Sequence, residues 1–270
     1  MSIESKFIEM KEMNHSDEAL RLTKEVKEKA LSSGADLVGI ISTESIDAIP
    51  RHWIGWVVQD HTKKSKDYMD DSKSVVVLGY QAWDNVHEIA IPRGGTWEYP
   101  VYQRMRLYAR RVLRFLQSLG YKAIIYPNLL SQKRMAQLAG LGNFGKNSLI
   151  INPKYGPWFR LQSILTDAEL VPDKPFEEDL CKDCDECIKA CPVDALAPYK
   201  IDPDKCLLGM KESEGIRLMT ENIIPDSLRN FPNIQSIYDK YMPRLTKNSI
   251  LLCMTCQKVC PYGREERGLI

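Results

Sequence analysis

The stretch that decides the fold of the C-terminal third reads Cys181-x2-Cys184-x2-Cys187-x3-Cys191-Pro192. A lone Cys206 follows, and a second run reads Cys253-x2-Cys256-x3-Cys260-Pro261. These eight cysteines all lie in the last 90 residues of the 270-residue chain, and no cysteine precedes them. Such a concentration of thiols at short, regular spacing predicts metal chemistry in this part of the chain.

The first run has the spacing typical of bacterial four-iron, four-sulfur (4Fe–4S) clusters. In that arrangement the fourth cysteine of a run binds the other cluster, so the two runs exchange one ligand each. The first ligand set is then Cys181, Cys184, Cys187 and Cys260. The second set is Cys191, Cys206, Cys253 and Cys256. Every cysteine is used once, and we predict two 4Fe–4S clusters that transfer single electrons.

Two other uses of eight cysteines fit the sequence less well. Two structural zinc sites would favour paired C-x2-C knuckles, and the triple spacing followed by x3-Cys-Pro departs from that pattern. Disulfides are compatible with an even count, but no secretory segment precedes the cysteines. Residues 1–14 are charged and polar, without the apolar stretch of a signal peptide. Reduced thiolates therefore favour a cytoplasmic protein.

Length and charge set broad limits on the fold and its partners. A chain of 270 residues suits one large or two small domains. The net charge of +1 predicts no bulk attraction to nucleic acid or membranes. The longest apolar runs, such as Val75–Leu78, have the length of a strand and not of a membrane span.

The first half alternates expected helices and strands, which favours an α/β layered domain. Helices are expected from Ser16 to near Gly34, from near Tyr99 to Gly120, and over Ser131–Ala139. A loop is expected at Pro92, Gly94 and Gly95. The expected strands are Ala35–Ser42, Ser74–Tyr80, Tyr121–Tyr126, Leu149–Ile151 and Trp158–Leu165. Pro172, Asp173 and Pro175 suggest a linker, so we predict domains at 1–174 and 175–270.

A glycine loop reads Gly140-Leu-Gly142-Asn-Phe-Gly145-Lys146-Asn147. It superficially matches a dinucleotide-binding fingerprint, but it follows a helix and precedes a strand, which is the wrong context. The loop favours close backbone approach to a large flat ligand, with Lys146 and Asn147 as polar contacts. Taken alone, a tight turn that needs positive φ is an equally good interpretation.

The helix expected from Tyr99 carries a set of tyrosines and arginines. Tyr102 and Tyr108 are candidate proton donors, and the arginines could bind an anion. The alternative is a solvated basic face with half-buried tyrosines, which the helix alone favours. The four histidines are scattered without ligand spacing and are expected at the surface: His15, His52, His61 and His87.

Three segments carry a resemblance to a known superfamily. They are Ala139–Asn147, Ile151–Trp158 and Ile164–Asp167. Together with the cysteine arrangement that follows, they resemble epoxyqueuosine reductases and reductive dehalogenases, and the likeness runs from about Ala35 to Cys260. The resemblance implies a nitroreductase-like α/β (α+β) domain that holds cobalamin base-off, beside a ferredoxin-like domain with two 4Fe–4S clusters.

The resemblance also implies site residues. The cluster nearer the corrin would reduce cobalt, and the glycine loop would lie against the corrin. The expected cofactor contacts are therefore Gly140, Leu141, Gly142, Gly145, Lys146 and Asn147. Lys146 would also stabilise developing negative charge during catalysis.

The chain departs from epoxyqueuosine reductases at two points. An ungapped comparison places Tyr108 where those enzymes carry an acidic proton donor. The C-terminal helical repeats that grip tRNA in those enzymes are also not present within the ten residues after Cys260. We therefore expect tRNA to be an unlikely partner. Tyr102-Gln-Arg-Met105 resembles a motif of the reductive dehalogenases. The respiratory members of that family carry export signals, and no such signal is expected in this chain.

These inferences predict a short cytoplasmic relative of both families: a cobalamin-dependent iron–sulfur reductase of a small molecule. The expected partners are a ferredoxin- or flavodoxin-type electron donor and no membrane, and a homodimer is compatible with the sequence. Two alternatives remain at this point. The chain could reduce or deliver corrinoids for another protein, or it could be a two-cluster electron carrier without its own substrate.

Overall fold

The computed structural model of the chain describes residues 3–54, 60–82, 84, 86, 89–93, 96–208, 232–247 and 249–268. Its centre is a four-stranded sheet in the order β1-β4-β10-β7. The strands are β1 (Leu37–Ser42), β4 (Ser74–Gln81), β10 (Phe159–Thr166) and β7 (Ala123–Ile125). All neighbouring pairs are antiparallel. Strand β4 is buried on both faces, which explains its unbroken apolar run.

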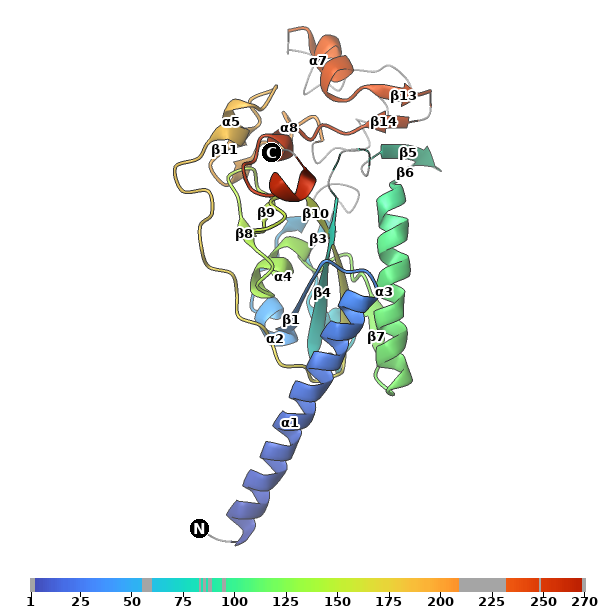
Figure 1. Ribbon diagram of the computed structural model, residues 1–270, viewed down its shortest axis with the longest axis vertical. Helices are drawn as coiled ribbons and strands as arrows, with labels where there is room; N and C mark the ends of the chain where they lie inside the picture. The colour runs from blue at the N-terminus through green and yellow to red at the C-terminus, as the bar shows by residue number, and fades with distance from the viewer. Residues whose placement is uncertain are drawn as a thin grey trace.

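Helices cover both faces of this sheet (Figure 1). On one face lie α1 (Ile3–Ser32) and α3 (Pro100–Ser118), packed against each other and the sheet. On the other face lie α2 (Thr43–Asp47) and α4 (Gln132–Leu138). The result is the mixed α/β layering that the alternating pattern predicted.

Helix α3 follows directly from its sequence. Tyr99 is the extended N-cap residue and Pro100 occupies the first helical position, where its missing N–H is harmless. The buried side chains repeat every three or four residues and form one face: Val101, Met105, Ala109, Val112 and Leu116. Gly120, at φ +91°, follows the end of the helix. The predicted helix is confirmed at both ends.

Two expectations need correction. Helix α1 begins at Ile3 and passes through Ser16 without interruption. The residues before Ser16 are rich in Glu, Lys and Met, and their helix propensity outweighs the N-cap signal of one serine. Pro92 lies inside strand β5 (Ile89–Arg93), which pairs only with short neighbours near the edge of a small sheet. Gly94 and Gly95 lie outside the described residues.

That small sheet joins the two halves of the chain. Its order is β13-β14-β5-β6, where β6 is Thr96–Glu98, β13 is Arg244–Thr246 and β14 is Ser249–Leu251. Two of its strands precede the predicted domain boundary at 174/175 and two follow it, so the parts share a sheet as well as an interface. Asp173, at the boundary, accepts hydrogen bonds from Lys27 Nζ (2.6 Å) and the Ile40 amide (2.8 Å).

The remaining elements are short. In the α/β half they are β2 (Trp53–Ile54), β3 (Asp60–His61), η1 (Ser65–Asp67), β8 (Asn143–Phe144) and β9 (Ile150–Ile151). In the cysteine-rich half they are α5 (Glu186–Lys189), β11 (Leu196–Ala197), β12 (Lys200–Ile201), α7 (Ile234–Tyr241), α8 (Thr255–Lys258) and η4 (Glu265–Arg267).

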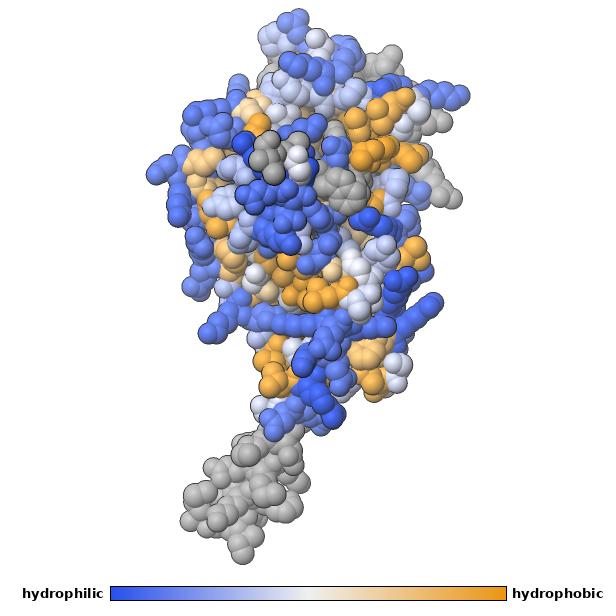
Figure 2. Space-filling model, in the orientation of Figure 1, coloured by the Kyte–Doolittle hydropathy of each residue, from blue (hydrophilic) through white to orange (hydrophobic). Residues whose placement is uncertain are grey.

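The surface is hydrophilic over most of the visible face (Figure 2). An apolar area lies toward the end where β5 and β14 meet. The exposed apolar side chains of the molecule include Ile91 on β5 and Leu245 on β13. Among the described residues, no helix combines the length and the apolar character that crossing a membrane requires.

Candidate functional site

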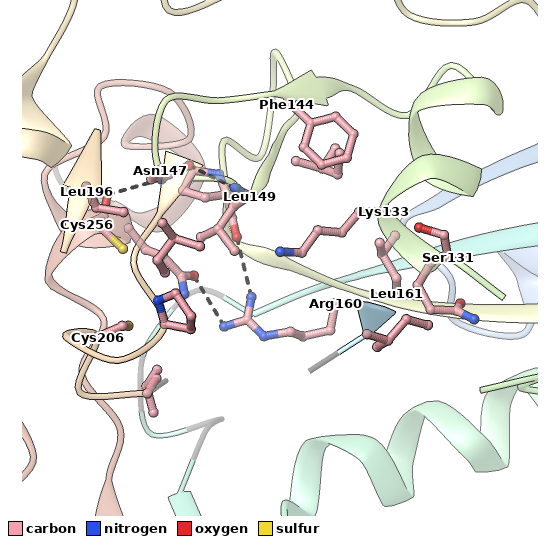
Figure 3. Close-up of a pocket in the computed structure, with 18 of the residues that line it drawn as sticks. Ser131, Lys133, Phe144, Asn147, Leu149, Arg160, Leu161, Leu196, Cys206 and Cys256 are labelled. Carbon is pink, nitrogen blue, oxygen red and sulfur yellow. Dashed lines mark hydrogen bonds between the residues drawn. The ribbon is translucent and has the colours of Figure 1, made fainter. Parts of the chain in front are cut away.

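A cavity of about 900 Å³ opens between the α/β half and the cysteine-rich half (Figure 3). Its α/β wall comes from residues 49–54, from the start of α4, and from the start of β10. Its other wall comes from residues 191–208 and 252–257. Most of the lining is apolar, with a few polar side chains, as in sites for small molecules and cofactors.

The tertiary structure brings the cysteines of distant segments together. Burial, and then the thiolates of Cys181, Cys187 and Cys184, raise the pKa of Cys260 to about 11. Burial also raises the pKa of Cys206 to about 11, with further contributions from Cys253 and Cys191. Thiols that resist ionisation must lose their protons when iron binds. The neighbours of Cys260 and Cys206 are the residues that cysteine spacing predicts as their co-ligands.

Cys256 belongs to the second of these groups and also links the two. Burial is the main cause that raises its pKa, and the charges of Cys253, Cys206, Cys187 and Cys191 add to it. All eight cysteines are free thiols, so the disulfide alternative finds no support. Within the described residues, no three His, Cys, Asp or Glu side chains converge as ligands of a single metal ion would. In a 4Fe–4S cluster each thiolate binds a different iron, which is a wider arrangement.

The two cysteine groups differ in their position relative to the cavity. Cys191, Cys206, Cys253 and Cys256 all line it. The other four cysteines are not part of the described lining. In the group that lines the cavity, the Ala195 N–H donates a hydrogen bond to Cys191 Sγ (3.3 Å). Thr255 Oγ1 lies 3.5 Å from Cys253 Sγ. Hydrogen bonds to cluster sulfurs tune reduction potential, so these contacts suit a redox centre.

The glycine loop packs closely against other backbone segments. A side chain at Gly142 would collide with the Ile151 carbonyl, and one at Gly145 with the Ile151 side chain. Gly140 has φ +74° and lies against the Lys174 carbonyl. Leu141 is buried in the core. These four residues allow the loop to pack closely on strand β9 and the linker, and they do not belong to the described cavity lining.

Lys146 also lies elsewhere than expected. Its backbone N–H donates to Cys181 Sγ (3.4 Å), and its Nζ donates to the Lys182 carbonyl (2.6 Å). The side chain therefore lies beside the first cysteine group, outside the described cavity lining. The catalytic role expected for Lys146 stays a prediction, and these contacts place the residue beside the first cysteine group.

Asn147 does line the cavity, alone among the six residues expected to contact the cofactor. It is buried, and its Nδ2 donates to the Cys256 carbonyl (3.5 Å) while its Oδ1 accepts from the Leu149 amide (3.1 Å). Asn147 thus connects the glycine loop to the cysteine group at the cavity.

The two candidate tyrosines of α3 have different surroundings. Tyr102 lines the cavity. Tyr108 packs against Gly34, where an added methyl group would meet its ring at 2.8 Å, and against Tyr80, with ring centroids 6.2 Å apart. Six residues along a helix turn a side chain to another face and carry it about 9 Å along the axis. Tyr108 therefore packs within the α/β half, and its role as proton donor stays a prediction.

Lys133 and Arg160 are polar residues of the cavity that the sequence alone did not single out. Lys133 on α4 donates from Nζ to the Ser148 carbonyl (2.8 Å), and Figure 3 shows it extending into the same space as Arg160. Protein surrounds Lys133 on most sides although its surface faces the open cavity. That burial lowers the pKa of Lys133, and the thiolates of Cys256 and Cys206 oppose the shift. Its surroundings suit a lysine that gives up a proton readily.

Tyr126 and His52 also belong to the polar part of the lining. Tyr126 adopts a left-handed backbone conformation (φ 51°), and burial raises its pKa while the charge of Arg106 opposes the rise. His52 is exposed, as expected, and it also lines the cavity. Its Nδ1 lies 3.1 Å from the Pro50 carbonyl and its Nε2 lies 3.2 Å from Ser131 Oγ. No local sequence signal distinguishes these residues, because their convergence depends on strand placement.

Comparisons with known proteins identify relatives of this chain. Residues 174–197 match the family described as 4Fe-4S binding domain. An epoxyqueuosine reductase from Leadbetterella byssophila is 26% identical over 265 residues, which cover 91% of this chain and 81% of the relative. One from Listeria monocytogenes is 30% identical over 163 residues, which cover 60% of this chain and 37% of the relative.

Solved structures show the shared fold. An epoxyqueuosine reductase with an epoxyqueuosine-modified tRNA stem loop has a TM-score of 0.63 at 23% identity, covering 90% of this chain and 66% of that chain. A catabolic reductive dehalogenase in complex with 3-bromo-4-hydroxybenzoic acid has a TM-score of 0.54 at 20% identity, covering 70% of this chain and 29% of that chain. The present chain is thus shorter than both.

The expectation that tRNA is an unlikely partner is wrong. The relatives of this chain are epoxyqueuosine reductases, and one of their solved structures holds a tRNA stem loop. These homologues indicate an oxidoreductase, and the chain is a homologue of the epoxyqueuosine reductases that shares its fold with the reductive dehalogenases.

Proposed function

We propose that the chain is a cobalamin-dependent iron–sulfur reductase in which electrons pass through two 4Fe–4S clusters to cobalt. One observation carries the proposal: four cysteines of one predicted cluster form a wall of the cavity whose opposite wall belongs to the α/β half. A volume of about 900 Å³ lies toward the upper end of small-molecule sites. A large cofactor and a cluster would therefore be direct neighbours.

The residues present suit both groups. The first cluster would use Cys181, Cys184, Cys187 and Cys260, and the second Cys191, Cys206, Cys253 and Cys256. Apolar side chains of the wall, such as Phe144, Leu149 and Leu161, would support a flat macrocycle, which the resemblance implies is bound base-off. When bound, cobalamin supplies a low-valent cobalt centre for reductive chemistry, and the clusters supply single electrons.

Side chains of the cavity would handle protons and charge. The phenol of Tyr102 and the ammonium group of Lys133 are the proton donors that reach the cavity from two different helices. Lys133 is held in place by the Ser148 carbonyl, so it can also stabilise negative charge that develops on a substrate. Asn147 would fix the position of the glycine loop relative to the second cluster.

Relatives suggest the chemical class of the substrate. One solved relative holds an epoxyqueuosine-modified tRNA stem loop, and another holds a brominated hydroxybenzoate. An epoxide and an aryl bromide share a reducible bond between carbon and an electronegative atom. We propose that this chain cleaves such a bond with two electrons and one proton, so that a C–H bond replaces the broken bond and the heteroatom is released as its anion. A second proton converts that anion to its protonated form.

The test is a measurement of cofactor content under anaerobic conditions. We expect eight iron atoms per chain and, after addition of cobalamin, a stoichiometric cobalt content with a base-off absorption spectrum. Replacement of Cys206 by Ser should damage one cluster and spare the other. Four iron atoms in the unaltered protein would remove the two-cluster assignment, and failure to retain cobalamin would remove the reductase proposal.

A further inference from the structure

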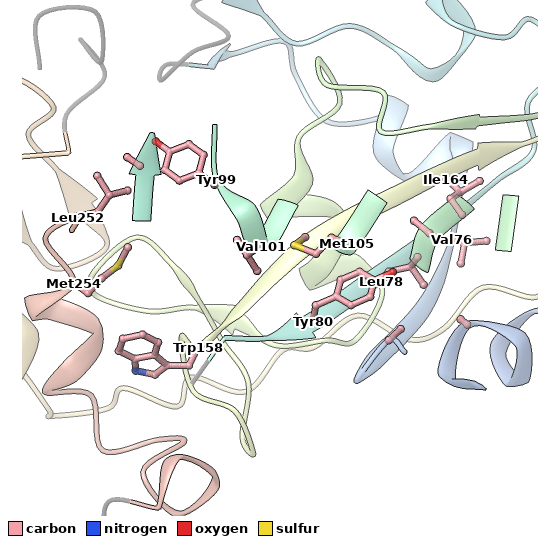
Figure 4. Packing of buried hydrophobic residues seen from close by; sticks show 14 of the residues in the cluster. Val76, Leu78, Tyr80, Tyr99, Val101, Met105, Trp158, Ile164, Leu252 and Met254 are labelled. Atoms are coloured by element: carbon pink, nitrogen blue, oxygen red, sulfur yellow. The ribbon is translucent and has the colours of Figure 1, made fainter. Parts of the chain in front are cut away.

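Gln257 lies between Cys256 and Cys260, yet its side chain and carbonyl contact the α/β half. It is 6% exposed. Its backbone carbonyl accepts from Trp158 Nε1 (3.0 Å), and its Oε1 accepts from Arg160 Nη2 (3.3 Å). Trp158 directly precedes β10 and Arg160 is the second residue of that strand. Because the two residues are two positions apart in extended chain, they lie on the same face. Figure 4 shows Trp158 next to Met254, which precedes this turn.

The orientation of the Gln257 amide is determined by its neighbours. Nε2 donates to Met254 Sδ (2.8 Å), which leaves Oε1 facing the guanidinium of Arg160. The backbone N–H donates to the Met254 carbonyl (3.0 Å). The reversed amide would direct an NH₂ group at a cation and leave the thioether without a donor. Every polar atom of this buried residue thus has a partner.

Packing alone does not require a glutamine here. An apolar side chain would fill the same space without the free-energy cost of burying an amide. The bond from Trp158 already fastens the turn through a backbone atom that any residue would provide. What the amide adds is a neutral acceptor for Arg160.

Arg160 occupies the boundary between the cavity and the second cysteine group. It lines the cavity, and its Nη1 donates to the Phe159 carbonyl (3.1 Å). Its Nη2 lies 4.0 Å from Met254 Sδ, the residue that follows Cys253. A positive charge at this boundary favours the more negative, reduced state of a nearby cluster.

The geometry points to Gln257 as a positioning residue, an inference that rests on the proposed function. It holds the Arg160 guanidinium against the turn that carries Cys253 and Cys256, so that the positive charge stabilises the reduced second cluster. The effect of Gln257 on the cluster is therefore exerted through Arg160.

A double-mutant cycle tests this coupling on protein with both clusters and no corrinoid. The variants are Gln257→Met, which keeps volume and removes the acceptor, Arg160→Gln, and the double variant. Electron paramagnetic resonance measures the fraction of each cluster reduced at the potential where the unaltered second cluster is half reduced. We expect Gln257→Met and Arg160→Gln each to lower the reduced-to-oxidised ratio of that cluster roughly tenfold. The double variant should fall no further than Arg160→Gln alone.

Two controls accompany the cycle. The first cluster of the same molecule should keep its ratio, and the exposed Gln235→Met on α7 should change neither cluster. Additive effects in the double variant, an unchanged second cluster in Arg160→Gln, or an equal shift in both clusters would each overturn the inference. If Gln257→Met fails to assemble, Gln257→Leu, which also removes the acceptor, takes its place in the cycle. Absence of clusters from the unaltered protein would instead contradict the proposed function.

Discussion

At the scale of single residues, Tyr102 and Tyr108 form a natural pair for comparison. Both are tyrosines of α3, but Tyr102 lines the cavity and Tyr108 packs against Gly34 and Tyr80. We expect Tyr102→Phe to retain clusters and cobalamin and to lower turnover roughly 10²–10⁴-fold, the usual contribution of general acid catalysis. Tyr108→Phe should keep activity near its original level. Steady-state kinetics on a reducible substrate would measure both, and a loss of turnover confined to Tyr108→Phe would restore that residue as the donor.

At the scale of elements, the glycine loop is expected to act on stability and not on ligand affinity. Gly142→Ala would push a methyl group into the Ile151 carbonyl, and such overpacking costs about 1–3 kcal/mol. Gly120→Ala is the matched control, because Gly120 has φ +91° and open space around it. It should show only backbone strain of about 1–2 kcal/mol. Chemical denaturation measures both values. A Gly142→Ala protein of unchanged stability but weaker cobalamin binding would show that the loop contacts the corrin after all.

At the scale of the whole molecule, the positions of the two cysteine groups suggest that electrons flow from the first cluster to the second. The first group lies outside the described cavity lining with Lys146 beside it, and the second lines the cavity. We expect Lys146→Gln to make the first cluster harder to reduce, because a positive charge next to it is lost, while Lys146→Arg should behave like the unaltered protein. Cobalamin affinity should be the same in all three. Redox titration and equilibrium binding check these outcomes, and weaker cobalamin binding in Lys146→Gln would place this lysine at the cavity.

Much of the local structure could be predicted because its signals are local. Pro100 and Gly120 delimit α3, and an apolar residue every three or four positions determines which face of that helix is buried. Ser16 shows where a local signal misled the prediction: its N-cap signal was outweighed by the helix propensity of the residues around it. The role of a glycine was harder to predict. A glycine that allows a ligand to approach the backbone and one that allows Ile151 to approach it look the same in the sequence.

The sequence by itself determined the cysteine spacing, and with it the expected division of eight thiolates into two sets, because ligand spacing is set by cluster chemistry within a short segment. Only the tertiary structure decided which side chains face the cavity. Tyr102, Lys133 and Arg160 come from three separate elements, and their meeting depends on the antiparallel sheet and on how α3 and α4 lie across its faces. Such long-range placement results from packing of the whole core, which leaves no periodic or local signal at the residues it brings together.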